Sequence, residues 1–426
     1  MAALRIADSE RPSSEGLYVH SLLGLAGAVL FLCLVTYDNW PLFSRAIGAI
    51  IVYSAPQIVY MLLSHKAAIR EHVNLDIDRP VVKRLIALCL ALGMIWSAYH
   101  IIELFGVERY KPARVLMDVA LPSLILMALP YLCLVNRIER GLQDGCFQVG
   151  NLLLDRLDPL DWRAIGEFFK GWLIKAFFFP LMFWELLAST AYFERSLFAE
   201  GNDVTYIYGI VVASIYFMDV CIASAGYLAT FRLFGWHIRS SNPHLGAWIF
   251  TLVCYYPFFG PVYRALLDYK DNYIWSDWLA DNPVLLMTWA AAIIILKICW
   301  IWSIAPFGLR FSNLTNRGVV TDGAFSLTKH PSYISKNLFW WLIHIPFISS
   351  IGITDGLTSC LQLLTINAIY FLRAQYEERH LSEEPRYVAY ALWIERHGIF
   401  RRLGCWFPAL RYQERMPTDS ERKFVV

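Results

Sequence analysis

The segment 283–305 reads PVLLMTWAAAIIILKICWIWSIA and holds one charged side chain, Lys297. An α-helix of about twenty apolar residues is long enough to cross the hydrocarbon core of a bilayer, so this segment predicts a membrane-spanning helix. Comparable windows recur along the chain, at 17–37, 42–64, 85–105, 114–136, 171–193, 206–231, 246–265, 283–305, 335–353 and 356–374. The sequence therefore predicts an all-α, polytopic integral membrane protein with about ten transmembrane helices.

The composition agrees with a membrane protein and disfavours other classes. Of 426 residues, 57% are hydrophobic and only 17% are charged, well below the charged fraction of soluble domains. The net charge of +2 gives no basic field, so nucleic acid is not expected as a partner. The nine cysteines form no CxxC pair, and we expect neither a disulfide framework nor a metal site.

Lysine and arginine residues indicate the orientation in the membrane. They concentrate in the loops 65–84, 137–170 and 306–334, which fall on the side of the predicted helices that also holds both termini. Cytoplasmic loops carry such an excess, so both termini, including the polar leader 1–16 and the tail 375–426, are predicted to be cytoplasmic. Within 137–170, apolar residues alternate with charges as in an amphipathic helix lying at the membrane interface.

Several charged residues fall inside or at the edge of the predicted spans, where an unpaired charge is costly. They are Glu103, Asp118, Lys175, Glu185, Asp219 and Lys297. Asp219 is the most central, and two roles remain open: a pair that fixes helix packing, or a polar wall of a substrate cavity. A transporter would show Gly- or Pro-interrupted helices in matching halves, and the prolines show no such symmetry.

The most unusual polar segment is 316–340, which leads directly into a predicted helix. Gly323 permits a tight turn, and Pro331 suits the first turn of a helix that carries Tyr333. His330 then lies at a helix N-terminus on the cytoplasmic side. A second polar segment, 373–390, follows the last predicted span.

The second segment brings acidic, basic and aromatic residues together. It begins with Arg373 and continues through Glu377, Glu378 and Tyr387. On a helix Arg373 and Glu377 are neighbours four residues apart, which allows an ordinary ion pair. Carboxylates can also hold an ammonium group, and aromatic faces can hold a sulfonium cation.

Together the two segments resemble the isoprenylcysteine carboxyl methyltransferase and phospholipid methyltransferase superfamily of integral membrane enzymes. The resemblance rests on Gly323-x-Phe325-x-x-x-Lys329-His330-Pro331-x-Tyr333 before a helical hairpin and on Glu377-Glu378-x-x-Leu381, Tyr387 and Tyr390 after it. It covers roughly residues 283–412. It implies a methyltransferase-like membrane domain at 283–426 with a cytoplasmic tail, after an N-terminal transmembrane bundle, 1–282, of unassigned role.

The resemblance also implies a cytoplasmic site for S-adenosyl-L-methionine and a lipid or lipidated methyl acceptor. The cofactor residues it implies are Gly323, His330, Pro331, Tyr333, Glu377 and Glu378. Arg373 and His330 are the implied catalytic residues. Acceptor contacts are expected from Lys329, Lys336, Tyr387 and Asp219.

Two questions stay open at this point. A carboxylate acceptor needs a cation such as Arg373, Lys329 or Lys336 to position it, whereas an amine acceptor needs a base such as His330. Membrane sterol and steroid reductases share a similar architecture and bind NADPH, so a reductase is the alternative reaction. The pair Glu377-Glu378 favours the methyltransferase.

Overall fold

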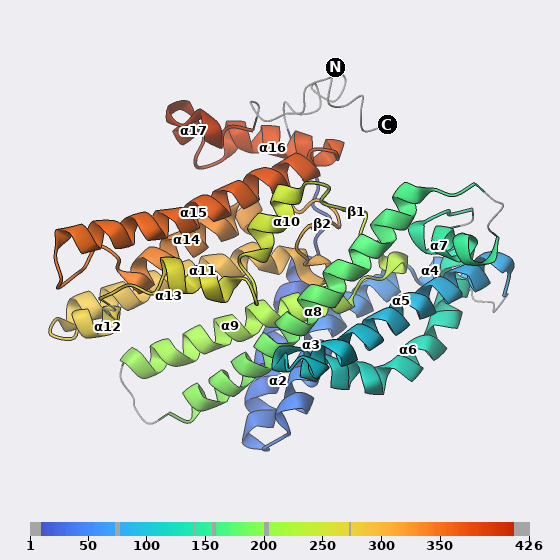
Figure 1. Ribbon diagram of the computed structural model, residues 1–426, viewed down its shortest axis with the longest axis horizontal. Coiled ribbons are helices and arrows are strands. Elements are labelled where there is room, and N and C mark those ends of the chain that lie inside the picture. Colours follow the sequence, from blue (N-terminus) through green and yellow to red (C-terminus); the bar gives the residue numbers. More distant parts are fainter. Residues whose placement is uncertain are drawn as a thin grey trace.

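The computed structural model describes residues 10–72, 77–139, 141–155, 159–199, 204–271 and 274–412. The predicted cytoplasmic segments 1–9 and 413–426 lie outside the described residues. The fold is mostly helical (Figure 1). This confirms the predicted all-α class.

Within the described part of the chain, eight helices are long and apolar enough to cross a membrane. They are α2 (Tyr18–Tyr37), α3 (Leu42–Ser64), α5 (Arg79–Leu104), α6 (Lys111–Ile138), α8 (Trp162–Leu197), α9 (Val204–Leu228), α13 (Pro283–Ile304) and α15 (Ile353–Leu381). Eight such helices are compatible with a multi-pass membrane protein.

The other two predicted windows form shorter helices. Window 246–265 divides into α10 (Leu245–Leu252) and α11 (Phe259–Leu266), because Pro257 and Pro261 cannot continue the hydrogen bonding of one helix. Window 335–353 gives α14 (Pro331–His344), which ends just before Pro346. The predicted number of about ten spanning helices is therefore not confirmed.

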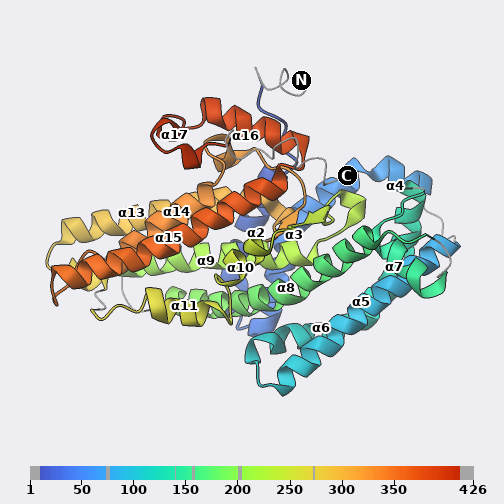
Figure 2. The same ribbon diagram turned by 45° about the horizontal axis from the view of Figure 1, so that its top comes forward.

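Although these helices are short, the segment α10–α11 and the helix α14 each run from one end of the molecule towards the other. Tyr208 near the start of α9 and Trp275 of α12 (Trp275–Trp278) have ring centroids 5.3 Å apart. The far end of α9 instead lies beside the end of α13, where Arg317 binds the Gly226 carbonyl. The path through α10 and α11 consequently runs the length of the bundle, and α14 returns beside α15 (Figures 1 and 2).

The remaining elements are short. The α-helices are α4 (Lys66–His72), α7 (Gly145–Leu154), α16 (Pro385–His397) and α17 (Leu403–Trp406), and the 3-10 helices are η1 (Glu108–Tyr110), η2 (Arg232–Phe234), η3 (Ala305–Arg310), η4 (Gly323–Ser326) and η5 (Pro408–Leu410). Strands β1 (Ser240–Ser241) and β2 (Thr315–Asn316) pair antiparallel. The segment 137–170 gives α7, which packs on α5 and α8, and the first turns of α8 itself.

Side-chain oxygens fix the starts of several helices. Asp78, Asp144, Asp161 and Asn282 accept hydrogen bonds of 3.0–3.1 Å from backbone amides in the first turns of α5, α7, α8 and α13. Each cap satisfies an amide that has no partner within its helix.

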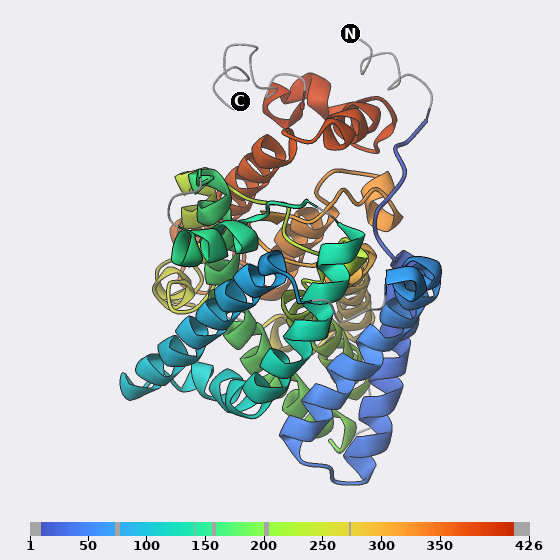
Figure 3. The same ribbon diagram turned by 90° about the vertical axis from the view of Figure 1, so that its right-hand side faces the viewer.

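The centre of the bundle is the α8–α9 pair. Phe178 and Phe183 of α8 and Phe217 of α9 are fully buried. Helices α3 and α6 both pack against α8, while α13 packs against α9. Figure 3 shows the neighbouring helices α2 and α3, coloured blue, on one flank of the bundle. The predicted boundary at 282 falls between α12 and α13, and separate roles for the two parts stay a prediction.

Most of the predicted intramembrane charges have partners. Asp118 pairs with Arg114 at 2.5 Å, Glu185 pairs with Arg109 at 2.7 Å, and Glu103 also pairs with Arg114. Pairing lowers the cost of a charge in an apolar environment. These residues therefore tie α5, α6, η1 and α8 together.

Lys175 and Lys297 use different partners. The Lys175 ammonium donates to the Thr230 hydroxyl at 3.0 Å. The Lys297 ammonium is fully buried and lies 3.7 to 4.2 Å from the ring centres of Tyr216, Trp300 and Phe339. Aromatic faces attract a cation, so this cage and the nearby Asp219 carboxylate partly offset the cost of burying Lys297.

Candidate functional site

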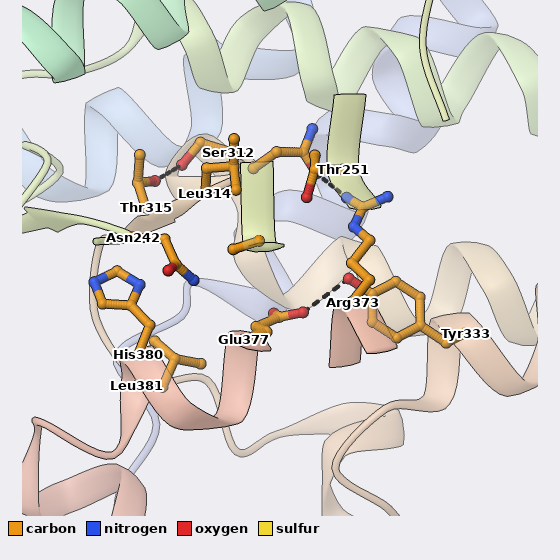
Figure 4. A pocket seen from close by; sticks show the side chains of 12 residues that line it. Asn242, Thr251, Ser312, Leu314, Thr315, Tyr333, Arg373, Glu377, His380 and Leu381 are labelled. Atoms are coloured by element: carbon orange, nitrogen blue, oxygen red, sulfur yellow. Dashed lines mark hydrogen bonds between the residues drawn. The ribbon is translucent and has the colours of Figure 1, made fainter. Parts of the chain in front are cut away.

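A cavity lies where α10, the loop before α14, and the last turns of α15 meet. It encloses about 410 Å³, counting the solvent at its mouth, and it is narrow. Its walls come from segments far apart in the sequence: Asn242, Ala247, Thr251, Ser312, Asn313, Leu314, Thr315, Tyr333, Arg373, Glu377, His380 and Leu381 (Figure 4). One guanidinium and one carboxylate thus face a shared space.

Arg373 projects from α15 into this cavity. Its Nη2 donates to Asn313 Oδ1 at 2.5 Å. Asn313 is in turn fixed, because its Nδ2 donates to the hydroxyls of Tyr227 at 2.8 Å and Tyr255 at 3.1 Å. The guanidinium carbon also lies 5.4 Å from the Tyr333 ring centre. The arginine is therefore held in one position by an amide and aromatic rings.

Glu377 lies one helical turn after the arginine and faces the same cavity, where its Oε2 accepts a 2.8 Å hydrogen bond from the Tyr333 hydroxyl. Its neighbour Glu378 lies about 100° further around the helix. It is only 1% exposed, and its Oε1 lies 2.8 Å from His330 Nε2 and 3.2 Å from Lys329 Nζ. The two adjacent glutamates therefore have different environments.

The opposite wall combines a histidine and an asparagine. His380 Nε2 lies 2.9 Å from the Ser240 hydroxyl on β1. Asn242 Nδ2 donates to the Tyr376 carbonyl at 3.1 Å, and the Asn242 carbonyl accepts from Trp248 Nε1 at 2.9 Å. The short β1–β2 pair and α10 are thereby attached to the last turns of α15.

The loop that supplies Asn313 is held by Arg317, which is 3% exposed. Its guanidinium donates five hydrogen bonds of 2.6–3.0 Å to backbone carbonyls, those of Gly226, Ala229, Trp236, Leu309 and Phe311. Burial and, to a lesser extent, the nearby Arg310 charge lower the pKa of Arg317 to about 9. All five donors of a planar guanidinium are used.

A second cavity, lined by apolar side chains, lies beside the first between α11, α14 and α15. It encloses about 260 Å³, again counting open solvent. Its lining residues are Val253, Cys254, Phe259, Val262, Trp340, Ile366, Ile369 and Tyr370. Tyr370 of this cavity and Tyr333 of the first have ring centres 5.7 Å apart.

The structure separates the predicted site residues into two groups. Arg373, Tyr333 and Glu377 line the first cavity. His330 and Glu378 are bonded to each other outside its lining, and Lys329 joins them while also pairing with Glu395 at 3.0 Å.

The remaining predicted residues lie apart from the cavity lining. Gly323 has φ +60°, and a side chain there would meet Pro306 and Trp302 at the end of α13. Pro331 is buried at the start of α14.

The expected acceptor residues are also distributed over two places. Lys336 lies 4.1 Å from the Trp300 ring centre and interacts electrostatically with Asp219, near Lys297. Tyr387 is buried on α16 against Tyr390. Burial raises the pKa of Tyr387, and the Glu378 carboxylate adds to this effect.

Sequence reasoning missed Asn313, Asn242 and His380 as cavity residues. Asn313 lies in the polar loop 306–334 that the sequence singles out, but its burial is evident only from the structure. His380 lies within the selected segment 373–390. Asn242 carries no sequence signal, because β1 is brought to α15 only by the fold.

The chemistry of this cavity suits a ligand with separate positive and negative groups. Arg373 can bind a carboxylate or phosphate, and Glu377 can bind an ammonium or a hydroxyl pair. Ser312, Thr315 and Thr251 add hydroxyls. The chain matches no protein-family model, no curated protein and no solved structure.

Proposed function

We propose that this protein transfers a methyl group from S-adenosyl-L-methionine to a lipidic or prenylated acceptor at the cytoplasmic face of a membrane. One observation carries the proposal. The two segments that resemble membrane methyltransferases meet at the cavity, where Tyr333 bonds Glu377 at 2.8 Å beside Arg373.

The lining residues match the groups of this cofactor. The Glu377 carboxylate suits its ammonium or ribose hydroxyls, and the Arg373 guanidinium suits its carboxylate. The Tyr333 ring suits a sulfonium, since aromatic faces attract onium cations. When bound, the cofactor would supply an electrophilic methyl group.

The protein's part in such a direct displacement is alignment and exclusion of water. Asn313 and the two tyrosines bonded to it hold Arg373 in place before any ligand arrives. A carboxylate acceptor would be positioned by this guanidinium. For an amine acceptor, His380 and Glu377 are the lining residues able to take up a proton.

The neighbouring apolar cavity supports a lipidic acceptor. Its walls, including Phe259, Trp340 and Ile366, offer apolar contacts to a hydrocarbon chain. Tyr370 of this cavity packs beside Tyr333, which lines the first cavity together with Arg373. An acceptor with a polar head and an apolar tail could therefore occupy both cavities.

The proposal is tested by titrating S-adenosylmethionine, S-adenosylhomocysteine and NADPH separately into the purified full-length protein and measuring heat or intrinsic fluorescence. We expect saturable binding of the first two. Binding of NADPH alone would replace the methyltransferase proposal by a reductase.

A variant of Glu377 tests the site itself. Glu377→Gln removes the charge but keeps the shape, and it should weaken S-adenosylmethionine binding about 10- to 100-fold, since a hydrogen bond to a charged group contributes about 1.5–3 kcal/mol. Glu383→Gln, an exposed position outside the cavity, is the matched control. Equal affinity in both variants would remove Glu377 from the site.

A further inference from the structure

Residues 399–410, which include α17 and η5, present large apolar side chains to the surroundings. Trp406 is 82% exposed, Phe407 61% and Ile399 59%. Three further side chains of this segment are also exposed: Phe400, Leu403 and Leu410. A concentration of exposed apolar residues in so short a segment indicates an interaction surface.

This surface does not belong to a membrane-spanning helix. The last long apolar helix ends at Leu381, and α16 then turns back. Figures 1 and 2 show α16 and α17 as a separate layer beside α14 and α15. The exposed aromatic side chains therefore need another explanation than burial in a transmembrane span.

The same segment and the residues that flank it are basic. Between residues 396 and 412 the chain has four arginines, Arg396, Arg401, Arg402 and Arg411, and no aspartate or glutamate. Arg401 and Arg402 are exposed and stand between Phe400 and Leu403 in the chain. Tryptophan and phenylalanine interleaved with arginine are typical of segments that lie in the headgroup region of an anionic bilayer.

We propose that residues 399–410 dock onto the anionic surface of the membrane into which this protein is inserted. Trp406, Phe407 and Ile399 enter the boundary between headgroups and acyl chains, while Arg401 and Arg402 contact acidic headgroups. The bilayer is favoured over a protein partner because the charge is complementary to it. The helices of the same chain also keep it within reach.

The docking would steady the loop beside the candidate site. The Tyr390 hydroxyl of α16 donates to the Phe325 carbonyl at 2.7 Å, and the Ile399 amide donates to the Leu327 carbonyl at 3.0 Å. Movement of α16 relative to the bilayer would be transmitted to residues 325–328, which lead directly into His330. The inference holds whichever reaction the site performs.

The test places a photoreactive p-benzoylphenylalanine at position 406 of the full-length protein in nanodiscs containing phosphatidylserine. The matched control carries the same residue in place of Glu383, which is exposed on the other end of the same layer. Irradiation should give lipid adducts at 406 at least ten times more often than at 383, by mass spectrometry. Adducts at 406 confined to another protein, to a second copy or to the chain's own 413–426 would overturn the proposal, and so would equal yields at both positions.

A second measurement tests the electrostatic part. In the chain whose only substitution is p-benzoylphenylalanine at position 406, the lipid-adduct yield should rise with the phosphatidylserine fraction and fall with added salt. The double variant Arg401→Gln and Arg402→Gln should lose most of that dependence while remaining folded, since both side chains are exposed. A double variant with unchanged dependence would exclude these arginines from headgroup binding.

Discussion

Arg317 shows how one side chain can organise several segments at once. The last carbonyls of a helix have no partner within it, and those of Gly226 and Ala229 at the end of α9 are satisfied by this guanidinium. The positive charge also suits the negative end of the helix dipole. The same group bonds the loop carbonyls that precede Asn313, so the position of the cavity wall depends on it.

Replacing Arg317 should therefore destabilise the fold. In Arg317→Met five buried carbonyls lose their donor, and the free energy of unfolding should fall by about 3 kcal/mol or more, since each buried unsatisfied group costs about 1–3 kcal/mol. Thermal unfolding of the detergent-solubilised protein measures the loss. Arg402→Met, at an exposed position, should leave the transition unchanged; equal transitions in the two variants would contradict this role.

The buried side chain of His237 should make the folded protein less stable in mild acid. Burial and the charges of Arg232, Arg239 and Arg310 together lower the pKa of His237 to about 4. The Asp144 carboxylate opposes this effect. The unfolded chain binds a proton near pH 6.5, whereas the folded protein resists protonation until about pH 4. The stabilisation present above pH 6.5 is consequently lost as the pH falls towards 4.

The measurement is the melting temperature between pH 7.5 and pH 4.5. His237→Asn should show a smaller decrease over this range than the parent protein, because the replaced side chain does not titrate. His397→Asn, an exposed position, is the control. An identical pH dependence in the parent protein and His237→Asn would exclude this histidine as the cause.

At the scale of elements, residues 10–17, which precede α2 and are called the strap, bind the loop between β2 and η4. The Glu15 amide donates to the Val319 carbonyl at 3.0 Å, and the Thr321 hydroxyl donates to the Pro12 carbonyl at 2.8 Å. The Glu15 carboxylate then joins three segments, because Arg239, Arg310 and Arg386 all lie within 3.2 Å of it. No local sequence pattern indicates this contact.

Removing the Glu15 charge should loosen that loop. Glu15→Gln leaves three neighbouring arginines with less compensating charge, and we expect a loss of about 2 kcal/mol of stability and faster amide exchange at residues 316–322. Exchange measured by mass spectrometry reports the loop directly. Glu10→Gln, exposed at the start of the strap, should exchange like the parent protein, and a matching profile for Glu15→Gln would show that the strap does not depend on this carboxylate.

Element boundaries were predictable where composition alone decides them. The helices α2, α3 and α13 begin and end within one residue of the predicted windows. Their sequences are long apolar runs with few charges, and such a run specifies a helix without contacts from distant parts of the chain. The helices α10, α11 and α14 are shorter than the apolar windows 246–265 and 335–353 predict, because Pro257, Pro261 and Pro346 interrupt these apolar runs. Proline has no backbone N–H to donate, so a helix ends there even though the apolar run continues.

At the scale of the whole molecule, the site was predictable only in part. Tyr333 of the segment 316–340 is hydrogen-bonded to Glu377 of the segment 373–390, and Arg373 and Glu377 share a face of α15 by simple helical spacing. The different environments of Glu377 and Glu378 follow from the packing of α14 and α16. The wall made by Asn242 and Asn313 could not be predicted, because it depends on contacts between residues far apart in the chain.

The path of the chain through the membrane is the remaining prediction at this scale. If all eight long helices cross the membrane, both ends of the described chain lie on the same side only when the shorter segments add an even number of further crossings. Tyr208 lies beside Trp275 at one end of α9, and Arg317 binds α9 at the other. The segments α10–α11 and α14 therefore each run between the two ends of the bundle, and both should cross the bilayer despite their short helices.

This predicts that residues 281 and 350 lie on the membrane side opposite to residue 397. Asp281→Cys, Ser350→Cys and His397→Cys, all at exposed positions, are treated in sealed vesicles with a membrane-impermeant thiol reagent and compared with the unsubstituted chain. In sealed vesicles, positions 281 and 350 should either both be labelled while 397 is protected, or both be protected while 397 is labelled. After permeabilisation all three positions should be labelled. Labelling of position 281 together with 397 would mean that α10–α11 stays on one side.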